Sequence, residues 1–197
     1  MAEQAENGCR IISAQHGGSF GLFKRCFGSW HEPMIADESW SWGWSRETDP
    51  NVKPMPSPKL NRGFRLKSNS SAVLVLPWST GRYADGFTRS PFGSQLRRYY
   101  EELAEFFEGI DERLRPVIVA RPHFEIHDLE PFAARFEWLQ RDSSEASFKE
   151  TLTRSRIAVV AYVGTTFLEV LAADVPSIFF WNPCFNPMHA DVETFFD

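Results

Sequence analysis

The chain has 197 residues, of which 43% are hydrophobic, so it can bury a core within one full domain or two partial ones. Its 21 basic and 26 acidic side chains give a formal charge of −5, which argues against a general nucleic-acid-binding protein. No apolar run reaches the ~18 residues that a membrane span needs. The N-terminus has no secretory signal and the three cysteines are widely spaced, so we expect a cytoplasmic location, including the inner face of the membrane.

A glycine-rich loop follows the first predicted strand. Residues 10–14 are typical of a short strand, and Gln15-His16-Gly17-Gly18-Ser19-Phe20-Gly21 come directly after it. Three glycines in this loop let the backbone turn sharply and approach a ligand closely. Histidine changes its protonation near neutral pH, so His16 is a candidate base or phosphate ligand. An ordinary turn with a solvent-facing histidine explains the spacing equally well.

Tryptophans alternate with small polar residues between Ala36 and Trp44, a pattern that predicts a strand with one aromatic face. A sugar-stacking platform is one interpretation, but a buried aromatic ladder is favoured because aromatic side chains dominate cores. Residues 49–70 begin with prolines at positions 50, 54, 56 and 58, which indicates a linker between two lobes.

Strands and helices alternate regularly after this linker. The strand patterns are apolar, as in strands covered on both faces, and lie at residues 72–77, 115–120, 157–163 and 175–181, with a weak one at 137–139. The helices are expected from Ser94 to Phe107, from a capping box at Ser147 to about Ser155, and after Gly164. This order predicts an α/β fold with a Rossmann-like parallel sheet and helices on both faces.

Two loops of this sheet carry candidate phosphate ligands. Arg121-Pro122-His123 follows the second strand. Pro122 restricts the backbone of Arg121 to an extended conformation, and the guanidinium of an arginine held there could bind a diphosphate. An ion pair of Arg121 with a carboxylate such as Glu125 or Asp128 is the structural alternative.

Gly164-Thr165-Thr166 joins a buried strand to a helix, whose N-terminus favours an anion. Both threonines are also ordinary helix-capping residues. Glu169 suits the diol of a ribose, although the spacing from Thr166 fits a capping box better.

Taken together, the loop at residues 15–21, the segment 37–44, the Gly164–Glu169 turn, and residues 175–178 with Trp181-Asn182-Pro183 resemble a bacterial family. Its members are transferases of surface-polysaccharide biosynthesis related to glycosyltransferases of the two-lobed GT-B architecture. The resemblance covers nearly the whole chain. It implies three regions: an end of the N-terminal, acceptor-side lobe at 1–48, the linker at 49–70, and a nucleotide-sugar-binding lobe at 71–197. Most of an acceptor lobe is missing, so we expect part of a longer enzyme.

The resemblance also implies roles for particular residues. Gly164, Thr165, Thr166 and Glu169 would lie in the nucleotide-sugar site. Arg121 and His123 would face the donor phosphates. The loop with His16, Gly17 and Gly18 would come from the acceptor side, with His16 as the base.

The expected reaction moves a sugar from a nucleotide-activated donor to a glycan or lipid-linked acceptor. No Asp-x-Asp pair occurs, so we expect neither a metal nor a cofactor, and a helix N-terminus with Arg121 would neutralise the leaving diphosphate. A nucleotide-sugar epimerase, a polyol-phosphate transferase and a non-catalytic nucleotide-binding fragment remain alternatives. The donor base, the sugar, the acceptor and the stereochemical outcome stay open.

Overall fold

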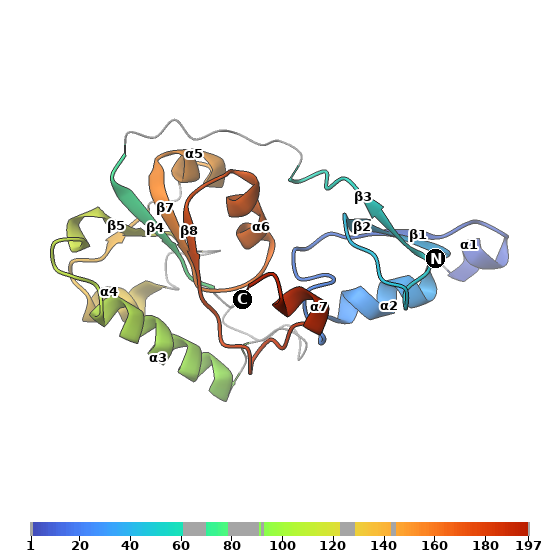
Figure 1. Cartoon of the computed structure of the whole chain (residues 1–197), viewed down its shortest axis with the longest axis horizontal. Coiled ribbons are helices and arrows are strands. Elements are labelled where there is room, and N and C mark those ends of the chain that lie inside the picture. Colours follow the sequence, from blue (N-terminus) through green and yellow to red (C-terminus); the bar gives the residue numbers. More distant parts are fainter. Residues whose placement is uncertain are drawn as a thin grey trace. The chain divides into compact units, whose positions relative to one another are not determined.

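The computed structural model describes residues 2–60, 70–78, 91, 93–122, 129–142 and 145–196. The chain forms two compact units. Residues Met1–Arg62 and Asn186–Asp197 make the first, and Gly63–Phe185 make the second (Figure 1).

The first unit contains a small parallel sheet. Its elements are α1 (Ala2–Glu6), β1 (Ile12–Ala14), α2 (Phe27–Ile35), β2 (Glu38–Trp42), β3 (Val52–Met55) and α7 (Ala190–Glu193). The strands lie in the order β1-β2-β3, and both pairs are parallel. Residues near the end of the chain join this unit through the bridge of Phe23 with Met188 and the ion pair of Arg46 with Asp191.

Two features of this unit differ from the predicted regions. β3 lies within residues 49–70, which the proline pattern assigned to a linker, and residues 186–197 lie with the first unit rather than with the second. Pro54 is compatible with β3 because this strand is at the edge of the sheet, where one side of the backbone needs no ladder partner.

The prediction of a buried tryptophan ladder is wrong. In β2 the buried side chains are Ser39 and Ser41, whereas Trp40 is 38% exposed and Trp42 is half-buried. The inward face of the strand is the one that meets α2, and it carries the small residues. Trp44 lies beyond the strand, where its indole Nε1 donates to the buried Gln15.

The second unit is a layered α/β domain. Its elements are β4 (Ala72–Leu76), α3 (Ser94–Glu108), the 3-10 turn η1 (Arg115–Val117), β5 (Ile118–Ala120), α4 (Glu130–Arg135), β6 (Gln140–Arg141), α5 (Phe148–Thr153), β7 (Ser155–Val160), α6 (Thr165–Ala172) and β8 (Ser177–Phe179). The five strands lie in the order β6-β5-β4-β7-β8, and all pairs are parallel.

The core of this unit has two parts, one on each face of the sheet. Val75 of β4 and Val159 of β7 pack with residues of α3 and α4, including Leu103 and Phe107. Their neighbours in sequence point the other way, because side chains alternate along a strand. Leu74, Leu76 and Val160 accordingly pack with residues of α5 and α6, and Figure 1 shows these helix pairs on opposite faces.

The sequence prediction of a Rossmann-like parallel α/β sheet with helices on both faces is confirmed. The capping box of Ser147 with Glu150 is also present, and α3 ends at Glu108, one residue beyond the predicted end, with Gly109 as its C-cap residue. The weak strand predicted at 137–139 lies slightly later, as β6 at Gln140–Arg141.

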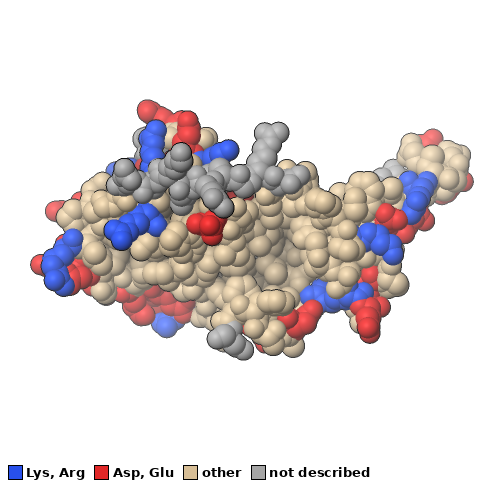
Figure 2. Space-filling model, turned by 45° about the horizontal axis from the view of Figure 1, so that its top comes forward, with Lys and Arg blue, Asp and Glu red and all other residues tan. Residues whose placement is uncertain are grey.

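In Figure 2, lysine and arginine side chains lie next to aspartate and glutamate side chains in several groups, and much of the drawn face carries neither. No helix among the described residues is long and apolar enough to cross a membrane.

Candidate functional site

The strand order of the second unit defines a topological switch point. β4 and β7 are neighbours, but the chain leaves β4 toward β5 on one side and leaves β7 toward β8 on the other. Ligands of open parallel α/β sheets bind in the crevice that such diverging connections leave outside the carboxyl ends of the strands. This point lies where β4 runs into Trp78 and where β7 runs into the Gly164 turn.

The Gly164 turn leads directly into α6. Gly164 is the N-cap residue and Thr165 is the first residue of the eight-residue helix. The ring of Tyr162 covers Gly164 so closely that a Cβ at this position would lie 3.1 Å from Tyr162 Cε2. The start of a helix carries its positive end, so this turn can receive an anion.

A chain of polar groups runs along the start of α6. The Tyr162 hydroxyl donates a hydrogen bond to Thr166 Oγ1 at 2.5 Å. The pKa of Tyr162 is raised to about 12, mainly because the side chain is buried; the bond to Thr166 lowers this pKa in part, and the Glu169 carboxylate adds to the rise. The hydroxyl is therefore a neutral donor at physiological pH, and Glu169 lies near enough to interact with it.

Glu169 does not form the capping box that its spacing suggested. The helix begins at Thr165, so Thr166 is not the N-cap residue and Glu169 is not at the third helical position. Its proposed contact with a ribose stays a prediction.

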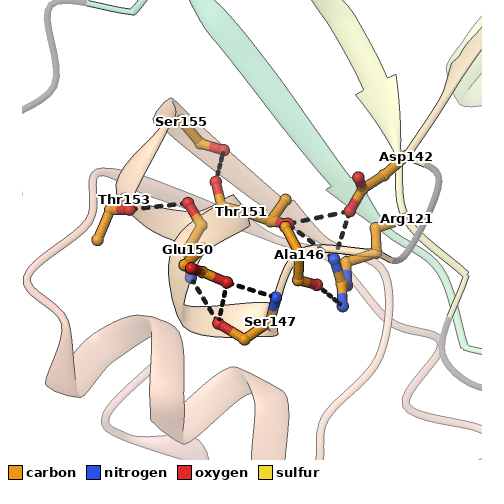
Figure 3. Close-up of polar contacts among 8 residues, drawn as sticks. All are labelled: Arg121, Asp142, Ala146, Ser147, Glu150, Thr151, Thr153 and Ser155. Carbon is orange, nitrogen blue, oxygen red and sulfur yellow. Dashed lines mark hydrogen bonds and ion pairs between the residues drawn. The ribbon is translucent and has the colours of Figure 1, made fainter.

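Arg121 follows β5 and is held in a network of its own unit (Figure 3). Its guanidinium donates to the Asp142 carboxylate, to Thr151 Oγ1 at 2.7 Å and to the Ala146 carbonyl at 3.0 Å. Thr151 in turn donates to Asp142 at 3.0 Å. The side chains of Arg121 and Asp142 are only 12% and 16% exposed, so this is a largely buried ion pair.

Arg121 thus forms an ion pair, as in the structural alternative given above, and its partner is Asp142. This residue follows β6 at the same edge of the sheet. The network ties the end of β5 to the start of α5. Contact of Arg121 with a donor phosphate stays a prediction. His123, and the carboxylates Glu125 and Asp128, lie outside the described residues.

The glycine-rich loop belongs to the first unit, so the structure does not fix its position relative to the Gly164 turn. His16 is exposed, and its Nε2 lies 2.9 Å from Oε1 of Glu32, a residue of α2. Its ring also lies in a T-shaped arrangement with the Phe20 ring, at a centroid distance of 4.9 Å. A carboxylate at Nε2 favours the tautomer with a proton on that nitrogen, which leaves Nδ1 to accept a proton.

Buried Gln15 organises this loop. Its Nε2 donates to the Gly17 carbonyl at 2.7 Å, and its Oε1 accepts from the Trp42 amide and the Trp44 indole. Gly21 has a φ of +73° and lies under the Trp44 ring, where a Cβ would come within 2.5 Å of Cε2. The loop that contains Gly17 and Gly18 is therefore held at two points, by the bond from Gln15 to Gly17 and by the packing of Trp44 on Gly21.

The described residues include no group of three or more His, Cys, Asp or Glu side chains that could hold a metal ion. The three cysteines are free thiols.

A protein-family model described as "LIC12162 family transferase" matches residues 1–197. The chain belongs to this transferase family. Family membership supports an enzyme that transfers a group, and it agrees with the resemblance at this level. Searches of curated proteins and of solved structures found no match.

Sequence analysis of this transferase missed two residues of the candidate sites. Glu32 is distant from His16 in sequence, and only the fold of α2 against the loop brings it to the imidazole. Tyr162 looked like part of a buried strand, although a tyrosine at the end of an apolar run is a signal that its hydroxyl needs a partner.

Proposed function

We propose that this chain is the donor-binding part of a glycosyltransferase. It would move a sugar from a nucleotide-activated donor to a surface glycan or a lipid-linked acceptor. The nucleotide sugar is a substrate, so the reaction needs no separate cofactor.

The observation that carries the proposal is the position of the Gly164 turn at the switch point between β4 and β7. A phosphate there meets the positive end of α6 and its first amides. The Tyr162 hydroxyl, already neutral and buried, holds Thr166 in place beside that position. Glu169, further along α6, is then suited to the ribose diol.

The proposed reaction is independent of metal ions. In the bond-breaking step the sugar–phosphate bond cleaves and the nucleoside diphosphate leaves with the bonding electrons. Fixed dipoles at the start of α6 stabilise this charge as it develops. Arg121 is the candidate side chain for neutralising the leaving diphosphate. Because its guanidinium is already paired with Asp142, it can do so only if it binds the phosphate and Asp142 at the same time.

The acceptor hydroxyl must lose a proton as its oxygen attacks the sugar. We assign this step to His16, because its Nε2 faces Glu32 and its Nδ1 is suited to accept the proton. Glu32 would fix the ring and stabilise the imidazolium that forms.

Titration calorimetry with uridine, cytidine and guanosine diphosphates tests the donor site. One nucleotide should bind, and Thr166→Val or Glu169→Gln should weaken it roughly tenfold or more, the effect of a lost hydrogen bond to a charged group. Thr153→Val is the matched control on α5, where the hydroxyl donates to Glu150 O.

Absence of binding by all three nucleotides, or equal loss in the control, would contradict the proposal. Product analysis without an acceptor separates transfer from epimerisation, and the identity of the moved group separates sugar from polyol phosphate.

A further inference from the structure

Helix α2 packs against its own unit with its small and polar residues. A Cβ at Gly28 would lie 2.4 Å from Cζ of Phe20, so the helix touches the ring at this glycine. Ser29 Oγ accepts from the Gly21 amide at 3.2 Å, and Glu32 pairs with His16. The Pro33 carbonyl accepts from Asn51 Nδ2 at 2.6 Å. The inward face of α2 is therefore largely hydrogen-bonded.

The outward face of α2 is apolar. No residue of the helix is buried, and its large hydrophobic residues are exposed: Phe27 by 46%, Trp30 by 51%, Met34 by 75% and Ile35 by 48%. The Phe27 ring contacts both Trp30, at 5.1 Å, and His31, at 4.5 Å. This arrangement is the reverse of an ordinary surface helix, whose apolar face turns to the core.

Two basic residues precede this helix in the sequence. Lys24 and Arg25 are both exposed, and only Cys26 separates them from the first residue of α2. The only carboxylate of α2, Glu32, is engaged with His16 on the inward side. The exposed apolar side chains of α2 thus follow two exposed basic side chains, in a chain whose net charge is −5.

We propose that this face of α2, with Lys24 and Arg25, docks on the surface of an anionic lipid bilayer. Tryptophan and phenylalanine are suited to the boundary between headgroups and acyl chains, and basic side chains beside them attract anionic headgroups. Four apolar side chains on one short helix are far fewer than the roughly 20–30 residues that each side of a stable protein interface contributes. A lipid surface requires no such area, because the helix can lie in its plane.

The proposal is independent of the proposed donor, and its test uses no nucleotide. The whole chain is sedimented with vesicles of phosphatidylcholine alone or of phosphatidylcholine mixed with phosphatidylglycerol, at low and high salt. We expect binding to the anionic vesicles that weakens with salt. Trp30→Ser/Met34→Ser should abolish it, and Lys24→Glu/Arg25→Glu should weaken it about tenfold or more.

The matched control is Leu114→Ser/Ile178→Ser, which removes two apolar side chains of the second unit that are 52% and 54% exposed. It should bind like the native chain. Circular dichroism should show that all variants keep their fold, since the changed side chains are exposed.

Three results would overturn the proposal: no binding of the native chain to anionic vesicles, equal loss in the control, or unchanged binding of the α2 variants. A dimer in solution that Trp30→Ser/Met34→Ser dissociates, without vesicle binding, would instead assign the face to a second copy of the chain.

Discussion

His16 and Glu32 are hydrogen-bonded within the first unit, with Nε2 and Oε1 2.9 Å apart. The pair joins the glycine-rich loop to α2, so the ring has one fixed orientation although it is exposed. A histidine held in this way is prepared for proton transfer, because a carboxylate sets its tautomer.

Glu32→Gln should therefore lower kcat more than it changes KM. The amide can still hold the ring but cannot stabilise an imidazolium, and we expect a fall of about 10²-fold in kcat, the lower range for general base catalysis. Steady-state kinetics with saturating donor measure it. The exposed Glu47→Gln is the control, and a purely structural role for Glu32 would change thermal stability with little effect on kcat.

The Tyr162–Thr166 hydrogen bond should couple the two side chains energetically. Tyr162→Phe and Thr166→Val each remove one partner, and each should lower the free energy of unfolding by about 1 kcal/mol. The double variant should lose less than the sum, because the second change removes a bond that is already broken. Urea unfolding of all four proteins gives the coupling energy, and strict additivity would show that the bond contributes nothing.

Arg121→Ala should destabilise the second unit strongly. It leaves the Asp142 carboxylate largely buried without its cation, and breaking a buried pair in this way costs about 3–5 kcal/mol. Arg121→Ala/Asp142→Ala should recover part of the loss, since no charge is then left alone. Denaturant unfolding measures both. A small effect for Arg121→Ala, similar to that of the exposed Arg113→Ala, would mean that the network contributes little.

Gly21→Ala should destabilise the first unit by about 2 kcal/mol or more. The new Cβ meets the Trp44 ring, and the φ of +73° is unfavourable for any side chain. Gly43→Ala is a matched control, because Gly43 has a φ of +90° but nothing within 4 Å of its Cβ position. The difference between the two variants in thermal unfolding isolates the contact with Trp44. Equal losses of stability in the two variants would show that backbone strain alone accounts for the need for glycine at position 21.

Much of the second unit follows from local sequence. Apolar runs with β-branched residues are typical of strands covered on both faces, and Ser147 with Glu150 caps α5 through groups only three residues apart. The Gly164 turn lies between such a strand and helix, so its place at a carboxyl edge of the sheet was also predictable.

Tertiary structure alone decided which faces are covered and which charges meet. Because side chains alternate along a strand, Trp40 and Trp42 lie on the same face of β2. Helix α2 packs on the opposite face of the strand, so Ser39 and Ser41 are the residues that become buried. Glu32, the partner of His16, is 16 residues away in sequence, and Asp142, the partner of Arg121, is 21 residues away. No local sequence pattern predicts either pairing. The periodicity of side chains along the sequence predicts whether a segment is a helix or a strand. Burial and ion pairing depend on contacts between elements that come together only when the chain folds.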